Sequence, residues 1–293
     1  MSLQVCLLGF GEVGQALAVD LGARGVSNLT AWDILFTVVD SGPRHATTGK
    51  SVRVAANVED ATAQADLVIS AVTAAQDVAA ARSVVPHLKR NAYFLDVNSV
   101  SPGVKVEVSQ IVEAGGGRYV ESAIMSPINP KRAASPMLFG GPHAAEFLPI
   151  ARQLGFTGAS VFSDRIGGAS AAKMCRSVII KGMEALLGES LLAARRYGVE
   201  GAVLQSLGTL LNTNDWHAQA RYMISRSLIH GRRRAEEMRE VARTVVEAGF
   251  EPRMSSACAV WQDWASAHRS AAAHEDLNDL LDAMTDGRSR GSV

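Results

Sequence analysis

The chain is poor in cysteine. Its 293 residues include only three cysteines, Cys6, Cys175 and Cys258, and no two of them form a C-x-x-C pair. This argues against a disulfide framework and against a cysteine zinc site. No cluster of His, Asp or Glu has the spacing of metal ligands either, so no metal is expected. A reducing cytoplasm is the simplest compartment for such a chain.

An excess of charge of one sign and long apolar runs are also lacking. Lys plus Arg number 29 and Asp plus Glu number 29, so the formal net charge is zero. A partner such as nucleic acid or an acidic membrane favours a basic protein, so neither is expected. No run reaches the roughly eighteen apolar residues of a membrane helix. With 47% hydrophobic and 20% charged residues, the composition is that of a globular protein with room for two domains.

Short apolar runs alternate with helical patterns in the first half of the chain. Strands that are apolar on both faces and alternate with helices indicate a doubly wound parallel sheet with right-handed crossovers. The predicted strands are Val5–Leu8, Leu29–Trp32, Leu67–Val72, Tyr93–Val97, Tyr119–Met125, Met137–Gly140 and Ser160–Ser163. The predicted helices of this half are Val13–Arg24, Ala74–Leu88 and Ala144–Leu154.

The pattern becomes helical after Arg165, where no convincing strand follows. Ala169–Tyr197 is apolar on nearly every face and ends in a cationic turn before Gly198. A helix that is apolar all round is buried in a core or a subunit interface, so a homodimer is expected. Further helices are predicted at Ala202–Leu211, at Trp216–Ala248 with a break allowed near Gly231, at Met254–Ala271 and at Leu277–Met284. The predicted fold class is therefore α/β, with a Rossmann-type domain over residues 1–166 and an all-helical domain over residues 167–293.

The run Gly9-Phe10-Gly11-Glu12-Val13-Gly14 is a G-x-G-x-x-G. Alone it is weak evidence, because tight turns often contain glycines. Here an apolar strand precedes it, a helix starts inside it, and Asp33 ends the next strand about 20 residues later, as a dinucleotide site requires. Gly9 then makes the turn, Gly11 admits the pyrophosphate and Gly14 permits close packing, while the helix N-terminus offers N–H donors. We predict that all six residues bind a nicotinamide dinucleotide.

Asp33 bears on which dinucleotide is bound. A carboxylate at this position accepts a hydrogen bond from the adenosine ribose 2′-OH and repels a 2′-phosphate, so NAD is favoured. Arg44 and Lys50 in the following loop keep NADP open, since they can reach a phosphate. Their alternative role is that of solvated loop charges.

Four further segments lie where a doubly wound sheet meets its ligand. They are Val72-Thr73-Ala74-Ala75, the segment from Asp96 to Pro102, the segment from Glu121 to Pro127, and Gly167 to Lys173 at the start of the long helix. In this order, together with the glycine run, they resemble the β-hydroxyacid dehydrogenase superfamily, which includes 3-hydroxyisobutyrate and 6-phosphogluconate dehydrogenases. The segments Lys173–Val178 and His230–Met238 resemble a less characterised, phosphogluconate-dehydrogenase-like branch of it. The resemblance covers most of the chain and implies a Rossmann-type domain, a helical domain that dimerises, and an active site between them.

The resemblance implies that Lys173 is the catalytic residue, because it occupies the lysine of the family pattern G-x-x-G-x-G-x-x-x-K. The residue itself is unusual, since a lysine among Ala and Gly on an apolar helix is costly to bury unpaired. A partly desolvated lysine near a helix N-terminus has a lowered pKa, which suits proton transfer to or from a substrate oxygen. The alternative is a lysine that extends to the surface from the helix end.

Cofactor and substrate contacts are also expected at the strand ends and along the helices. Val72, Thr73 and Asn98 are predicted to contact the cofactor, although Asn98 and Ser99 also suit a turn before Pro102. The family's serine–glycine–glycine loop is Met125-Ser126-Pro127 here, with its serine offset by one position. The predicted substrate contacts are Ser99, Ser122, Met125, Ser126, Arg176, Ser177 and His230.

Two of these predicted contacts have ordinary alternatives. Arg176 stands near the family asparagine and either holds a carboxylate bidentately or pairs with an acidic side chain. His230 either contacts the substrate or is a hydrogen-bonded helix histidine. The charges from Arg232 to Glu237 are expected to form mostly a solvated helix face.

These residues together predict an NAD(P)-dependent oxidoreductase. Hydride would pass between nicotinamide and a hydroxyl-bearing carbon of a small hydroxyacid or sugar acid, with Lys173 as general acid or base. Two alternatives stay open. Imine reductases share this architecture but usually lack the lysine, and a non-catalytic dinucleotide sensor would not need one.

Overall fold

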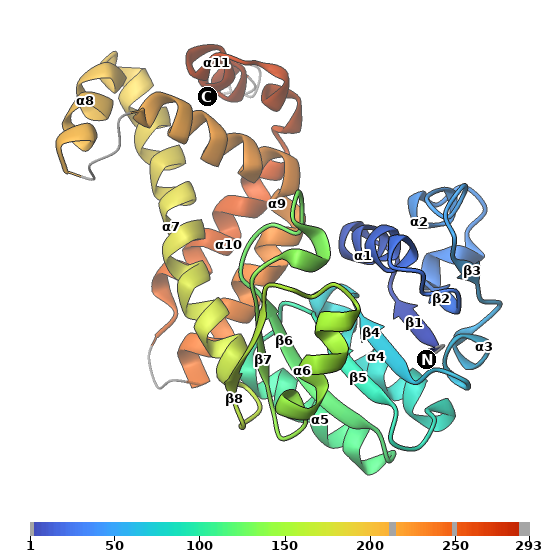
Figure 1. The fold of residues 1–293 in the computed structure, drawn as a ribbon. Coiled ribbons are helices and arrows are strands. Elements are labelled where there is room, and N and C mark those ends of the chain that lie inside the picture. The colour runs from blue at the N-terminus through green and yellow to red at the C-terminus, as the bar shows by residue number, and fades with distance from the viewer. Residues whose placement is uncertain (1–2, 211–214, 248–250, 287–293) are drawn as a thin grey trace. The chain divides into compact units, whose positions relative to one another are not determined.

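The computed structural model describes residues 3–210, 215–247 and 251–286 (Figure 1). The chain divides into two compact units, Met1–Met174 and Cys175–Val293.

The first unit is built on an eight-stranded sheet, counted over the described residues, with the order β3-β2-β1-β4-β5-β6-β7-β8. All neighbours are parallel except β6 and β7, which are antiparallel. The strands are β1 (Val5–Leu8), β2 (Leu29–Trp32), β3 (Arg53–Val54), β4 (Leu67–Ser70), β5 (Tyr93–Asp96), β6 (Arg118–Ile124), β7 (Met137–Gly140) and β8 (Ala159–Ser163). The chain order reverses between β1 and β4, and the ligand crevice of such sheets lies at that switch point. The predicted Rossmann-type α/β fold is confirmed.

Helices cover both faces of this sheet. The helices of the first unit are α1 (Glu12–Ala23), α2 (Gly42–His45), α3 (Val58–Thr62), α4 (Asp77–Val84), α5 (Pro102–Ala114) and α6 (Ala144–Gln153). Alternate strand residues enter two separate cores, as the period of a strand requires. Val5 and Leu7 pack in the core that contains residues of α1 and α6, whereas Cys6 and Leu8 pack in the core that contains residues of α4 and α5.

Four elements of the first unit, the strand β3 and the helices α2, α3 and α5, were not expected. Strand β3 is only two residues long and both are exposed, so it has no apolar pattern to detect. Helix α5 was not expected because its valines favour strands. It forms because Ser101 caps its N-terminus, accepting a hydrogen bond from the Val104 N–H at 3.4 Å, and Pro102 occupies the first turn.

The second unit is helical over its described residues. Its helices are α7 (Gly168–Tyr197), which begins in the first unit, α8 (Glu200–Leu210), α9 (Trp216–Glu247), α10 (Arg253–Ser266) and α11 (Leu277–Asp286). Helix α9 is continuous through Gly231. A Cβ there would lie 2.3 Å from the Gln262 carbonyl oxygen, so the glycine permits close packing on α10 and does not break the helix. Among the described residues, no helix is both long and apolar enough to cross a membrane.

The charged run of α9 is partly buried. The Arg234 side chain has only 4% of its surface exposed and pairs with Glu184 of α7, whose side chain is 3% exposed. Glu237 pairs with Lys181 of α7 as well as with Arg233. The expected solvated face is therefore wrong for Arg234 and Glu237, because burial against α7 depends on tertiary packing that charge pattern alone does not show.

The division between the two units falls within the residues of α7. The predicted domain boundary after residue 166 falls just before this helix, whereas the structural division falls after Met174. The first turns of α7 belong to the first unit because Ser170 and Lys173 hydrogen-bond to residues at the end of β5. This places Lys173 in the same unit as the sheet.

Candidate functional site

The glycine run joins β1 to α1 at the carboxyl edge of the sheet. Gly9 has a φ of +93°, and a Cβ there would lie 2.4 Å from the Ala71 carbonyl oxygen. A Cβ on Gly14 would lie 2.2 Å from the Gly9 carbonyl oxygen, whereas nothing lies within 4 Å of a Cβ on Gly11. No side chain caps the N-terminus of α1. The loop therefore offers open space and free N–H donors to a pyrophosphate, and the residues present fit a dinucleotide.

Asp33 follows β2 and lies beside this loop. One carboxylate oxygen accepts a hydrogen bond from the Phe10 N–H at 2.7 Å and the other from the Leu35 N–H at 2.8 Å. Both bonds fix the carboxylate against the glycine run. Because an ionised carboxylate has about four acceptor positions, it can still accept a bond from a ribose hydroxyl.

Arg44 and Lys50 contact the same region. Arg44 donates a hydrogen bond to the Phe36 carbonyl oxygen. The Lys50 Nζ lies 5.5 Å from the centre of the Phe10 ring, within the range of a cation–π contact. Arg44 is nevertheless exposed and Lys50 is partly exposed, so their role toward a 2′-phosphate stays a prediction.

The Asn98 side chain joins the ends of β4 and β5. Its Oδ1 accepts a hydrogen bond from the Val72 N–H at 2.7 Å. Its Nδ2 donates to the Ser70 hydroxyl at 2.9 Å and to Asp77 Oδ1 at 2.7 Å. Asn98 is 4% exposed, so its amide sets the shape of the loop that carries Val72 and the exposed Thr73. Its assignment as a direct cofactor contact stays a prediction.

A buried layer of polar side chains lies beneath these loops. Ser70, Asp96 and Glu121 occupy the same register position on β4, β5 and β6. Asp96 accepts hydrogen bonds from Lys105 Nζ at 2.7 Å and from the Tyr119 hydroxyl at 2.7 Å. Lys105 is thus the cation that compensates the buried carboxylates.

Asp77 belongs to the same layer and carries a perturbed carboxyl group. Burial, and after it the charge of Asp96, raises the pKa of Asp77 well above 3.8, although Lys105 and Asn98 act in the opposite direction. Its Oδ2 is buried without a hydrogen-bond partner. The folded protein therefore holds a proton on Asp77 more tightly than the unfolded chain does.

We expect the stability to carry the signature of this proton. The free energy of unfolding should fall as pH rises above 3.8, the value of the unfolded chain, until the folded-state pKa is passed, by up to about 1.4 kcal/mol per pH unit for one proton. Asp77→Asn should flatten this slope, whereas the control Asp40→Asn, at an exposed site, should keep it. Urea unfolding at several pH values measures both. An unchanged slope in Asp77→Asn would assign the proton to another group.

Lys173 lies in the second turn of α7 and reaches the end of β5. Its Nζ donates a hydrogen bond to the Ser99 hydroxyl at 2.5 Å. Both side chains are partly exposed. The structure thus brings together the predicted lysine and the predicted Ser99 at the carboxyl edge, one residue from Asn98.

The loop after β6 holds the other predicted contacts of this unit. Ser122 is fully buried and its hydroxyl has no hydrogen-bond partner, so a substrate cannot reach it in this conformation. Met125 and Ser126 are partly exposed, and the Ser126 hydroxyl donates to the Pro127 carbonyl oxygen at 2.9 Å. Asn129 Nδ2 donates to Glu12 Oε1 at 3.4 Å, which ties this loop to the start of α1.

The remaining predicted contacts belong to the second unit. Arg176 is exposed, Ser177 is buried and His230 is partly buried on α9. Their roles toward a substrate stay predictions.

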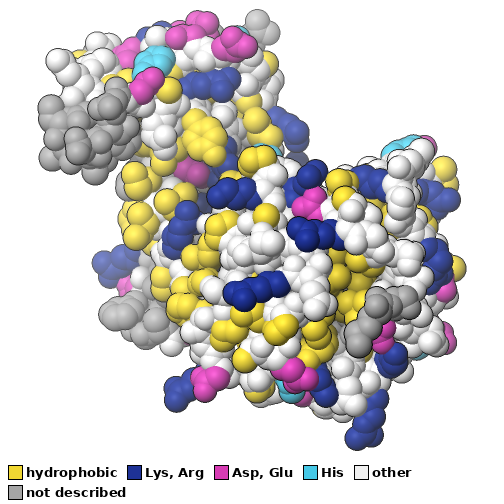
Figure 2. Space-filling view, viewed as in Figure 1, with side chains coloured by type: hydrophobic (Ala, Val, Ile, Leu, Met, Phe, Trp, Pro, Cys, Tyr) yellow, Lys and Arg dark blue, Asp and Glu magenta, His cyan; other side chains and the backbone are white. Residues whose placement is uncertain are grey.

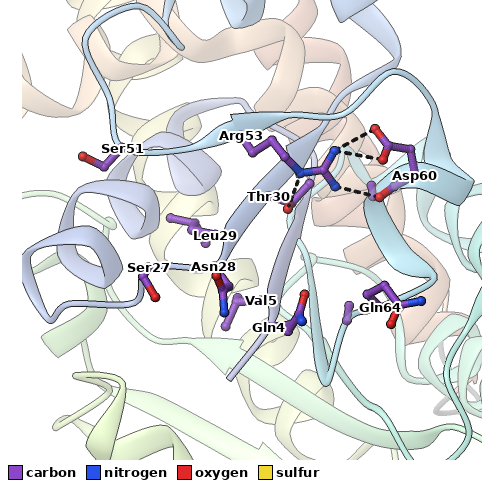
Figure 3. Close-up of a pocket in the computed structure, with 12 residues that line it drawn as sticks. Gln4, Val5, Ser27, Asn28, Leu29, Thr30, Ser51, Arg53, Asp60 and Gln64 are labelled. Atoms are coloured by element: carbon purple, nitrogen blue, oxygen red, sulfur yellow. Dashed lines mark hydrogen bonds and ion pairs between the residues drawn. The ribbon is translucent and has the colours of Figure 1, made fainter. Parts of the chain in front are cut away.

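A polar depression of about 420 Å³ lies at the opposite edge of the sheet, near the amino ends of β1 and β2 (Figure 3). In it, Arg53 Nη1 donates to both carboxylate oxygens of Asp60 at 2.8 Å. The glycine run, Asp33 and Lys173 do not line it. It is therefore not the candidate site.

Sequence reasoning did not assign roles to the buried charges of the first unit. Asp77, Asp96, Lys105 and Glu121 are all buried, and Glu121 contacts the start of α7 directly. The available signal was that charged residues stood in or beside strands and helices otherwise apolar. No sequence pattern indicated that these four charged side chains lie close together in the fold.

Comparisons with known proteins support a dinucleotide-binding fold. The model of the NAD binding domain of 6-phosphogluconate dehydrogenase matches residues 4–162. A domain of unknown function, DUF1932, matches residues 194–265. A conserved hypothetical protein from Sinorhizobium meliloti is 34% identical, with 97% of this chain and 96% of that chain covered and a TM-score of 0.73.

Two further solved structures are similar. A conserved protein of unknown function, described as structurally similar to 3-hydroxyacid dehydrogenases, is 32% identical over 90% of this chain and 97% of its own, with a TM-score of 0.69. The 3-hydroxyisobutyrate dehydrogenase of Mycobacterium tuberculosis is 18% identical over 97% of this chain and all (100%) of its own, with a TM-score of 0.70, and at that identity shows the fold alone.

The fold and the glycine loop define a Rossmann-type protein with an NAD(P) cofactor. The chain belongs to the β-hydroxyacid dehydrogenase superfamily, within the family that carries the NAD binding domain of 6-phosphogluconate dehydrogenase.

Proposed function

We propose that this protein is an NAD(P)-dependent dehydrogenase or reductase of a small hydroxyacid or sugar acid, with NAD preferred over NADP. The observation that carries the proposal is the position of Lys173, hydrogen-bonded to Ser99 at the carboxyl edge of the sheet. That edge is where a doubly wound sheet binds its dinucleotide. A non-catalytic sensor of NAD(P) would not need a lysine at this position.

In this proposal, different residues of the first unit bind the cofactor and transfer the proton. The glycine run holds the pyrophosphate, Asp33 the adenosine ribose, and Val72, Thr73 and Asn98 shape the nicotinamide end of the site. Bound NAD(P) supplies the hydride acceptor or donor. As a neutral amine, Lys173 takes the proton of the substrate hydroxyl during oxidation, and as the resulting ammonium it returns the proton to the carbonyl oxygen during reduction. Ser99 orients the amino group.

The substrate is proposed to be acidic. Met125 and Ser126 are partly exposed in the loop next to α1, and Arg176 is an exposed cation three residues after Lys173. A guanidinium group binds a carboxylate bidentately, which favours an acid over a neutral alcohol. Ser122, Ser177 and His230 are kept as candidate contacts. With all three cysteines free, a reducing cytoplasm is the proposed compartment.

Imine reduction is the second candidate function. Imine reductases, for example that of Myxococcus stipitatus, share this fold. An imine carbon accepts hydride and its nitrogen accepts a proton, but imine reductases usually lack a lysine at this position, so Lys173 argues against this candidate. The screen described next distinguishes imine reduction from the oxidation of hydroxyacids.

The experiment is a screen of small hydroxyacids, sugar acids and amino alcohols with NAD⁺ and NADP⁺, with the matching ketoacids and imines in the reverse direction. Formation or loss of the reduced nicotinamide is followed by its absorbance. Turnover of hydroxyacids supports the proposal, and turnover of imines alone supports the second candidate. Binding of NAD(P)H without turnover of any member would favour the sensor.

We also propose that the protein is a homodimer. Figure 2 shows hydrophobic side chains among the charged ones at the surface. In the helical unit, the apolar side chains of Ile179 on α7 and Val260 on α10 are 64% and 71% exposed. A helix that is apolar all round is buried in a core or a subunit interface, and dimer formation would cover these side chains. We expect light scattering to give a mass of twice the 31.0 kDa of one chain. A mass of 31.0 kDa at micromolar concentration would contradict the dimer.

A further inference from the structure

The first turn of α7 receives its cap from a strand, and the capping residue is Glu121 of β6. Its Oε2 accepts a hydrogen bond from the Gly167 N–H at 2.7 Å, and its Oε1 accepts one from the Ser170 N–H at 2.6 Å. The first N–H groups of a helix have no partner within the helix, so they need acceptors from elsewhere. A carboxylate 46 and 49 residues away in sequence satisfies two of these donors.

The surroundings of Glu121 are shaped for this contact. Gly140 lies opposite it on β7, and a Cβ at that position would come within 2.5 Å of Glu121 Oε2. Gly167 has a φ of +96°, which favours glycine and turns the chain so that its N–H faces the carboxylate. Both glycines therefore leave room for the carboxylate of Glu121.

The cap also determines where Lys173 lies. Ser170, held by Glu121 through its N–H, donates its hydroxyl to the Val100 carbonyl oxygen. Lys173 follows three residues later, on nearly the same face of the helix, and its Nζ meets Ser99, the residue before Val100. The chain of contacts runs without a gap from Glu121 to the ammonium group.

We infer that Glu121 is the positioning residue of the active site: it fixes the register of α7 on the sheet and sets the electrostatic field at Lys173. This deepens the proposed function and rests on it for the role of Lys173. Glu121 itself does not touch the reacting atoms.

The charge of Glu121 opposes the positive end of the helix. An N-terminus is equivalent to about half a positive charge, which by itself disfavours an ammonium group one turn away. A carboxylate on the first N–H groups offsets that charge. Burial raises the pKa of Glu121, whereas Lys105 and the two backbone hydrogen bonds from Ser170 and Gly167 lower it.

The test reads Lys173 directly and needs no substrate. The chain contains six lysines, so protein labelled with ¹³C at lysine Cε gives a simple NMR spectrum, in which Lys173→Arg assigns the signal. We expect Glu121→Gln to lower the titration midpoint of Lys173 by about one pH unit. Glu107→Gln, which removes an exposed carboxylate paired with Arg82, should leave the midpoint unchanged. Titration with NADH and NADPH, followed by fluorescence, should show that dinucleotide binding is retained.

A second variant keeps the inference open to disproof if Glu121→Gln does not fold. Glu121→Asp retains the charge but is one methylene shorter, so it cannot reach both N–H groups. The titration midpoint of Lys173 in this variant should lie below that of the wild type and above that of Glu121→Gln. If only Glu121→Asp folds, its midpoint should still lie below that of the wild type. A wild-type midpoint in whichever variant folds would overturn the inference. Because turnover is not the readout, this outcome is separate from a failure of the proposed function, which is tested by the activity of Lys173 variants.

Discussion

Lys173→Met should lower kcat by about 10²–10⁴-fold, the usual contribution of a general acid or base. Methionine keeps the length and apolar stem of the side chain but cannot carry a proton. The hydrogen bond to Ser99 is also lost. The pyrophosphate loop lies on other elements of the sheet, so the dissociation constant of NAD(P)H should change little. Steady-state kinetics on a substrate from the screen, with a parallel fluorescence titration of NAD(P)H, measures both quantities.

A matched control separates chemistry from the loss of a lysine as such. Lys89 is also a lysine of the first unit, but it pairs with Asp66, which hydrogen-bonds to Gln4 beside the amino end of β1. Lys89→Met should therefore leave kcat within about twofold of the wild type, as surface substitutions usually do. If Lys173→Met kept wild-type turnover, the proton would have to come from another group and the proposed mechanism would be wrong.

The second large effect is expected at Asp33. Asp33→Asn should shift the ratio of the NAD and NADP dissociation constants by about 10–100-fold toward NADP. A hydrogen bond to a charged group contributes about 1.5–3 kcal/mol, and each 1.4 kcal/mol is a factor of ten. Removing the charge weakens the bond to the ribose hydroxyl and relieves repulsion of the 2′-phosphate. We expect that phosphate to be attracted by Arg44, which bonds to the Phe36 carbonyl oxygen, and by Lys50, which lies over the Phe10 ring.

The ratio is the informative quantity because Asp33 also supports the loop. Its carboxylate accepts bonds from the Phe10 and Leu35 N–H groups, so any substitution disturbs both cofactors through the backbone. That disturbance cancels in the ratio. The exposed Asp40 lies in the same stretch of chain, and Asp40→Asn should leave the ratio unchanged. An unaltered ratio in Asp33→Asn would show that the carboxylate does not select the cofactor.

Much of the fold could be predicted from local sequence. Strands β1, β2 and β7 have the predicted bounds, because a run of apolar residues between turns is a complete signal of a buried strand. Helix α7 also has nearly the predicted bounds, since only its start differs, by one residue. Helix α5 was missed because its capping by Ser101 and Pro102 outweighs the strand preference of its valines, and β3 because two exposed residues carry no pattern.

The candidate site was predictable only in part. The glycine run and Asp33 could be predicted as cofactor contacts from their spacing, because the turn and the ribose contact lie within one strand–helix–strand unit. Lys173 was named from its motif, but its partner Ser99 stands 74 residues away in the chain. No periodicity links two residues at that separation.

The sequence by itself determined the alternation of strands and helices, the glycine turn and the apolar long helix, because each depends on residues within a few positions of one another. Only the tertiary structure decided which charges are buried together. Glu121 and Gly167 meet through the pairing of β6 with its neighbours and the start of α7, and Asp77 meets Asn98 through the joining of two strand ends. Such contacts arise from sheet order and from the absence of a side chain at Gly140, and these are properties of the packed fold.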